Sequence, residues 1–277
     1  MTLFEAIILG LVQGLSEFLP ISSSGHLALL QYFFGIEGES VLTFAVLLHL
    51  GTLLSIFAVY YKDIWDLTKE LGATIKDIFM GKGPRINANE TRRLGFMIIT
   101  ATIPTGIIGF AFQDLFGELY VSLVAIGVGL LITGTFLWFA ERMAHGKKVI
   151  QNMKFRDAFL VGIFQSIAIC PGISRAGSTI VGGLLSGIKR ELAVKFAFLI
   201  SIPSVLGAVI LEAPAAFKEG TDAILLVPIL VGVTIAAISG YIAIKTMIRV
   251  VSNKKLYYFS FYTWAVGAFV LVYVLLN

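Results

Sequence analysis

The chain has 277 residues, of which 57% are hydrophobic and 14% are charged, with a mean hydropathy of +0.91. This composition excludes an ordinary soluble domain and indicates an integral membrane protein. A single cysteine excludes a disulfide framework and a thiolate zinc site, and the three histidines are too scattered to suggest a metal site. The net charge of +4 fits basic cytoplasmic loops better than a nucleic-acid partner.

In chain order, the apolar stretches predict six membrane-spanning helices and two interrupted regions. The interrupted regions, 3–34 and 158–188, each contain two short apolar pieces around a polar turn. A helix over 158–170 would reach about 20 Å, which is too short for a hydrocarbon core of about 30 Å. These regions are therefore predicted to be re-entrant helical hairpins, and no signal peptide is expected in the first. The spans are expected at 43–60, 94–112, 119–140, 192–211, 223–244 and 257–276.

Part of the chain is present twice, because residues 5–54 align with residues 157–206 without a gap. Gly10 aligns with Gly162, and Gln13 aligns with Gln165. We expect an all-α polytopic fold in a single membrane domain over 1–277. It would consist of repeat 1 at about 1–140 and repeat 2 at about 155–277.

The basic residues predict how the two copies are oriented. Most lysines and arginines fall in 62–93, 142–156 and 245–255, and the positive-inside rule places these segments in the cytoplasm. Between 156 and 245 the chain must cross the membrane an even number of times, and spans 192–211 and 223–244 already supply two crossings, so hairpin 158–188 enters from the cytoplasm. Span 43–60 must run inward to reach the basic segment 62–93, so hairpin 3–34 enters from outside. The repeats are thus predicted to have inverted topology, with both chain termini outside. Their tips, near 20–26 and 171–179, should meet near the midplane.

Full charges are scarce in the predicted apolar zone, and each tip carries one. Glu17 belongs to the first tip and Arg175 to the second. An ionisable residue at this depth is a functional candidate, although an ion pair that only locks the hairpins together is the alternative. Each tip also begins a helix, so free N–H groups and the positive end of the helix dipole adjoin the gap. With Arg175, these features favour a phosphate-like anion.

The polar residues of the first tip suggest further chemistry. Gln13 and Glu17 are four residues apart on one helix face, and Glu17 can bind Mg²⁺ or Ca²⁺. Helix capping accounts for Ser22, and for Ser174 in the second tip, but leaves Ser23 and Ser24 unexplained. His26 can act as an acid or a base near neutral pH, although a lone histidine is more often structural.

Two segments, QGLSEFLPISSSGH at 13–26 and PGISRAGST at 171–179, resemble the two signature motifs of the undecaprenyl-diphosphate phosphatase family, also called bacitracin-resistance proteins. Length, hydropathy and motif spacing agree along the whole chain. The resemblance implies a hydrolase of the cytoplasmic (cell) membrane that converts undecaprenyl (polyisoprenyl) diphosphate to the monophosphate and inorganic phosphate. It further implies an active site at the outer face, recycling of the lipid carrier for peptidoglycan synthesis, and bacitracin resistance.

The resemblance also implies roles for individual residues. The implied catalytic residues are Glu17, Ser23, His26 and Arg175, and Glu17 would hold the Mg²⁺ or Ca²⁺. The implied substrate-binding residues are Gln13, Ser22, Ser24, Gly25, Ser174, Gly177 and Thr179. Two departures occur: Gln13 replaces a carboxylate that some members carry, and Ala176 replaces the usual serine. Attack by Ser23, by His26 or by water stays open.

The expected partners are a long-chain polyisoprenyl diphosphate lipid, the membrane and, in a homodimer, a second copy of the chain. The main alternative function is a secondary transporter or flippase for a lipid phosphate or another anion, because inverted repeats with broken helices are typical of transporters. The serine, histidine, glutamate and arginine together favour hydrolysis, since a carrier needs no nucleophile. A channel is least favoured, because no rings of charge or filter-like runs are present.

Overall fold

The computed structural model describes residues 2–35, 39–143, 146–218 and 223–277, and His145 lies outside these ranges. Regular secondary structure within them is helical, without a strand. The α-helices are α1 (Leu3–Phe18), α2 (Ser23–Phe34), α3 (Glu39–Val59), α4 (Tyr61–Phe79), α5 (Glu90–Ala111), α6 (Gln113–Tyr120), α7 (Leu123–Arg142), α8 (Phe155–Ile167), α9 (Arg175–Leu185), α10 (Arg190–Lys218), α11 (Ala223–Ser252) and α12 (Tyr257–Leu276). One 3₁₀ helix, η1, covers Ile150–Asn152.

The chain is a multi-pass membrane protein, as its composition predicts. Among the described residues, five helices are long and apolar enough to cross a membrane. The expected span at 43–60 lies in α3, which bends by 88° into α4 and counts as a sixth span only together with it. The five helices are α5, α7, α10 over Arg190–Ile210, α11 over Leu226–Ser252, and α12.

Both interrupted regions fold as pairs of short helices, which confirms the predicted hairpin form. Helices α1 and α2 have 16 and 12 residues, and α8 and α9 have 13 and 11. At a rise of 1.5 Å per residue, even the longest reaches only about 24 Å, against an apolar core of about 30 Å. The depth of the hairpins in the membrane stays a prediction.

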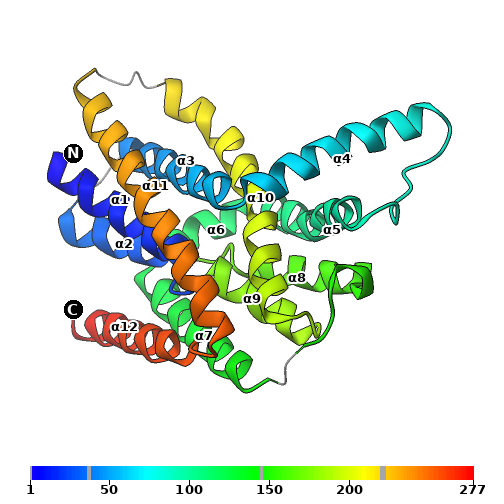
Figure 1. Ribbon diagram of the computed structural model, residues 1–277. Coiled ribbons are helices and arrows are strands. Elements are labelled where there is room, and N and C mark those ends of the chain that lie inside the picture. The colour runs from blue at the N-terminus through cyan, green and yellow to red at the C-terminus, as the bar shows by residue number, and fades with distance from the viewer. Residues whose placement is uncertain (1, 36–38, 144–145, 219–222) are drawn as a thin grey trace.

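The two halves of the chain pack against each other reciprocally. Helix α1 lies along α11 of the second half, α8 lies along α5 of the first half, and α7 pairs with α12 (Figure 1). At the tips, a Cβ added to Gly25 would lie 3.2 Å from Cα of Gly172, and one added to Gly177 would lie 3.3 Å from Cβ of Pro20. Gly25 aligns with Gly177 in the sequence repeat, and Pro20 aligns with Gly172. The contacts are thus exchanged between the copies, as a two-fold relation between repeats would require.

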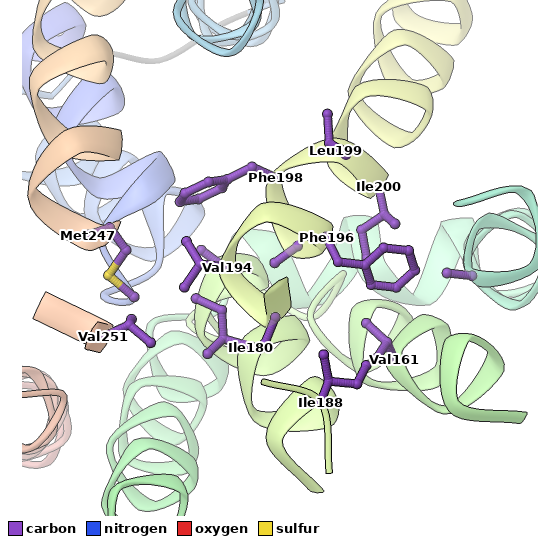
Figure 2. Close-up of a cluster of buried hydrophobic side chains, with 14 of the residues drawn as sticks. Val161, Ile180, Ile188, Val194, Phe196, Phe198, Leu199, Ile200, Met247 and Val251 are labelled. Atoms are coloured by element: carbon purple, nitrogen blue, oxygen red, sulfur yellow. The ribbon is translucent and has the colours of Figure 1, made fainter. Parts of the chain in front are cut away.

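The largest hydrophobic cluster lies around the second hairpin. Val161 of α8, Ile180 of α9, Phe196 of α10 and Met247 of α11 all contribute buried side chains to it (Figure 2). Phe18, the last residue of α1, belongs to the same cluster, and packs edge-on against Phe198 of α10 at 5.4 Å between ring centroids. This core therefore holds the end of the first helix against the second half of the chain.

Helix α7 approaches the second tip unusually closely, and a glycine permits it. A Cβ added to Gly129 would lie 2.9 Å from Cα of Gly172. One turn later, the Thr133 hydroxyl donates to the Gly172 carbonyl at 2.9 Å and accepts from the Ser174 N–H at 2.9 Å. The second tip is therefore fixed to α7 by backbone contact and by one bridging hydroxyl.

Candidate active site

Glu17 is the centre of the polar contacts between the tips, and it is only 6% exposed. Its Oε1 accepts a hydrogen bond from Nη2 of Arg175 at 2.5 Å. Its Oε2 accepts from the Ser23 hydroxyl and from Nε2 of Gln13, the latter at 3.1 Å. Nε2 of His49 lies 3.9 Å from the same oxygen. One buried carboxylate thus contacts both tips and α3, and the predicted meeting of the tips is confirmed.

The first tip turns at Ser22, whose backbone has φ 70° and ψ 98°. This left-handed region is rare for residues with a side chain, and such backbone often occurs at functional sites. The Ser22 hydroxyl caps α2 by accepting from the Gly25 N–H at 3.2 Å, and it also lies 3.2 Å from the Ser24 hydroxyl. The capping interpretation of Ser22 is therefore confirmed. The turn begins α2 so that its first residue, Ser23, bonds to Glu17.

His26 is oriented by two contacts within α2 and α12. Its Nδ1 lies 2.9 Å from the Ser22 carbonyl oxygen, and its Nε2 lies 2.8 Å from the Tyr262 hydroxyl. The carbonyl can only accept, so Nδ1 carries a proton, and in the neutral imidazole Nε2 then accepts from the tyrosine. The two rings also stack, with centroids 5.6 Å apart. Within the described residues, no hydrogen bond joins His26 to Ser23.

The second tip begins α9 and directs its first residue, Arg175, at Glu17. The Ser174 hydroxyl caps α9 by accepting from the Gly177 N–H at 3.1 Å, so its capping interpretation is also confirmed. The Thr179 hydroxyl donates to the Arg175 carbonyl at 2.8 Å. Because α2 and α9 both begin at the tips, two positive helix ends adjoin the Glu17 cluster.

A divalent cation was predicted at Glu17, and one further oxygen near this carboxylate is without a partner in the part of the molecule that the structure describes. Oε1 of Gln13 is buried and, within the described part of the chain, has no hydrogen-bond partner. No group of three histidine, cysteine or acidic side chains able to hold a metal occurs among the described residues. One carboxylate and one amide oxygen do not form a complete cage. A cation held there would need waters and substrate oxygens to complete its coordination, as is usual for Mg²⁺.

The sequence predicted most of this cluster but missed three residues. The structure brings Gln13 and Ser23 to Glu17 as expected. The missed residues are His49, left without a role, Thr133, which holds the second tip, and Tyr262, which holds His26. The only sequence signal for Thr133 is a hydroxyl within an apolar span.

The fold and the site define a class: a polytopic α-helical membrane protein with a buried cluster of arginine, carboxylate and serine between two helix N-termini. Residues 6–269 match the family described as bacitracin resistance protein BacA, and the chain belongs to this family. It is 51% identical over the full length of both chains to a protein of Alkaliphilus metalliredigens named undecaprenyl-diphosphatase. Proteins of the same name from Carboxydothermus hydrogenoformans and Methanosphaera stadtmanae are 42% and 38% identical, each with 98% of this chain and 97% of the relative covered.

Proposed function

We propose that this protein is an undecaprenyl-diphosphatase, which hydrolyses the lipid diphosphate to the monophosphate and inorganic phosphate. The observation that carries the proposal is the Glu17 carboxylate, which accepts from the Ser23 hydroxyl while it pairs with Arg175. A nucleophile, a proton acceptor and an anion-binding cation are thereby in contact at one point. The names of the full-length relatives point to the same reaction.

Substrate binding begins with an exchange of partners at Arg175. Two oxygens of a diphosphate can accept from the planar guanidinium together, and the helix ends add backbone N–H groups. Transfer of Arg175 from Glu17 to the phosphate leaves the carboxylate free to accept a proton. Arg175 then stabilises the charge that develops on the transferred phosphoryl group.

The chemical step follows from the Ser23 contact. Glu17 takes the hydroxyl proton as Ser23 Oγ attacks the terminal phosphorus, and the bond between that phosphorus and the bridging oxygen breaks. Undecaprenyl monophosphate leaves, and Ser23 carries the phosphoryl group until water hydrolyses it to inorganic phosphate. A bound Mg²⁺ or Ca²⁺ would be held by Glu17 and Oε1 of Gln13 and would neutralise charge on the phosphate oxygens.

His26 supports this step through its contacts with the first turn and α12. Because its Nε2 accepts from Tyr262, it contributes a positioned imidazole and not the base for Ser23. The remaining candidate substrate contacts are the Ser24 hydroxyl and the N–H groups that begin α2 and α9. Ser174 and Thr179 support the tip through their backbone bonds.

The proposed location is the cytoplasmic (cell) membrane, with the site opening to the outer face and both termini outside. The inverted assignment of the repeats rests on the basic segments, and both termini lie at the same side of the molecule in Figure 1. In this location the enzyme would recycle the lipid carrier for cell-wall synthesis and confer bacitracin resistance. Assembly as a homodimer stays a prediction.

A transporter or flippase for a lipid phosphate is the second candidate, because the two halves exchange contacts around broken helices. Phosphate release from a long-chain isoprenyl diphosphate by the purified protein, with and without EDTA, separates the two functions. Hydrolysis predicts release that EDTA abolishes. Absence of release, together with substrate uptake into vesicles that contain the protein, would overturn the proposal in favour of transport.

A further inference from the structure

Helix α4 carries two stripes of charge on neighbouring faces. Because seven residues make nearly two helical turns, residues at that spacing form one line along a helix. The lysine stripe consists of Lys62, Lys69 and Lys76, and the acidic stripe consists of Asp63, Glu70 and Asp77. The two stripes have different surroundings.

The acidic stripe faces the protein. Glu70 accepts from Nε of Arg92 at 2.9 Å, and Asp77 accepts from Nη1 of the same residue at 2.7 Å. Asp63 accepts from Nζ of Lys195 in α10 at 2.5 Å. These three pairs hold the acidic side of α4 against α5 and α10, and they fix the rotation of the helix about its axis.

The lysine stripe faces away from the protein, and all three lysines are exposed. Lys69 lies 3.5 Å from Asp66, but both side chains are more than half exposed, so this pair contributes little. Within the described residues no ion pair involves Lys62 or Lys76. The stripe is therefore a row of cations available to an external anion.

An apolar face runs directly beside the lysine stripe. One side of α4 carries the apolar residues Tyr61, Trp65, Ile75 and Phe79. Relative to Tyr61, the other three are four, fourteen and eighteen residues along the chain, and these spacings keep all four on the same side of a helix. Trp65 is 61% exposed and Phe79 is 87% exposed. The Lys69 ammonium lies 5.4 Å from the centre of the Trp65 ring, so the aromatic and cationic groups are adjacent.

The direction of α4 suits a membrane surface. It leaves α3 at 88°, and in Figure 1 its far end extends beyond the other helices. If α3 crosses the membrane as the sequence predicts for 43–60, this right-angle turn directs α4 along the bilayer plane. An apolar face with aromatic residues, bordered by lysines, is the usual pattern of a helix in the headgroup region.

We propose that α4 binds the anionic phospholipids of the cytoplasmic leaflet. The apolar face enters the boundary between headgroups and acyl chains, and the lysine stripe binds headgroup phosphates. The ion pairs to Arg92 and Lys195 set the orientation that presents both surfaces to the lipid. Charge complementarity selects a lipid surface over a second copy of the chain, because the exposed stripe has one sign.

Trp65 provides the test in the intact protein. The protein is placed in nanodiscs of phosphatidylcholine alone or mixed with phosphatidylglycerol, with one lipid brominated on its acyl chains. The difference between wild type and Trp65→Phe isolates the fluorescence of this residue. We expect quenching by both lipids and preferential quenching by brominated phosphatidylglycerol, which weakens at high salt.

The triple substitution Lys62→Gln, Lys69→Gln, Lys76→Gln should reduce the preference for phosphatidylglycerol over phosphatidylcholine by about fivefold per lysine. The control Lys82→Gln, Lys147→Gln, Lys255→Gln removes the same charge from exposed lysines elsewhere and should keep the preference. A Trp65 signal that neither lipid quenches would overturn the proposal, and so would equal preference in both triple variants. Burial of Trp65 in a dimer without quenching would instead assign the face to a second copy. These readouts do not depend on hydrolysis.

Discussion

Arg175 donates a hydrogen bond to Glu17 at 2.5 Å, although the two residues are 158 positions apart in the chain. This contact joins the tips of the two hairpins. It also occupies the guanidinium that a diphosphate needs. In the proposed mechanism, substrate competes with Glu17 for Arg175, and its binding frees the carboxylate for proton transfer from Ser23.

The first prediction separates this role from a structural lock. Arg175→Ala should lower phosphate release by about a hundredfold to a thousandfold, as loss of a transition-state donor does elsewhere. The double variant Glu17→Arg, Arg175→Glu swaps the two charges, so it restores an ion pair but removes the carboxylate beside Ser23. We expect it to recover thermal stability without activity. Recovery of both would mean that the pair only locks the hairpins.

The second prediction concerns the Tyr262 contact with His26. Tyr262→Phe keeps the stacked ring but removes the hydroxyl that Nε2 accepts from, and one such bond corresponds to about a tenfold change in activity. We expect a similar loss of phosphate release and a changed pH profile, because the hydroxyl no longer donates to the imidazole. Tyr258→Phe on the same helix is the control, because Tyr258 is 57% exposed. An unaltered rate and pH profile for Tyr262→Phe would show that the contact is incidental.

The third prediction tests the fixation of the second tip by α7. Gly129→Ala places a Cβ 2.9 Å from Cα of Gly172, so the tip or α7 must shift. We expect overpacking to lower the free energy of unfolding by about 1–3 kcal/mol. Activity should fall as well, because Arg175, the first residue of α9, follows Gly172 closely in the second tip. Gly72→Ala is the control, since nothing lies within 4 Å of the added Cβ. Thermal unfolding that is equal for both variants would contradict the proposed fixation.

The fourth prediction concerns the connection between the halves, at a group outside the spans. Burial opposes the charge of Asp157, but the Lys154 N–H at 2.9 Å and Nζ of Lys148, also at 2.9 Å, outweigh it and hold the pKa of this carboxyl below its usual value. A carboxyl whose pKa is lower in the folded state than in the unfolded state stabilises the fold at pH values above its unfolded pKa. This stabilisation is lost as the pH falls through the folded-state pKa.

Asp157→Asn should therefore lower the melting temperature at neutral pH. The difference in melting temperature between this variant and wild type should narrow below about pH 4. Asp114→Asn, at an exposed position of α6, is the control for loss of charge. A gap that stays constant through the acid range would contradict the assignment.

Much of this architecture was readable from the sequence because its signals are local. Apolar length indicated the spans, and polar turns inside short apolar pieces indicated the hairpins. The repeat and the basic segments indicated that the tips carrying Glu17 and Arg175 should meet. The serines at the start of each second helix indicated caps, and Ser22 and Ser174 form them.

The rest depends on contacts between distant elements. Tyrosine is common near membrane interfaces, so nothing in the sequence distinguishes Tyr262 from an ordinary anchor. It reaches His26 only because α12 packs on α7 next to the first hairpin. The same packing turns His26 toward Tyr262, whereas the sequence could only place it near Ser23. His49 likewise approaches Glu17 through the tertiary position of α3.

The most direct test of the proposed mechanism compares two adjacent serines. Ser23 bonds to Glu17, whereas Ser24 bonds to Ser22 within the turn. Phosphate release from a long-chain isoprenyl diphosphate should fall by at least about a thousandfold in Ser23→Ala, since the nucleophile is removed. In Ser24→Ala it should stay within about tenfold of wild type, the size of one hydrogen bond. A Ser23→Ala protein that folds and releases phosphate at the wild-type rate would contradict the mechanism.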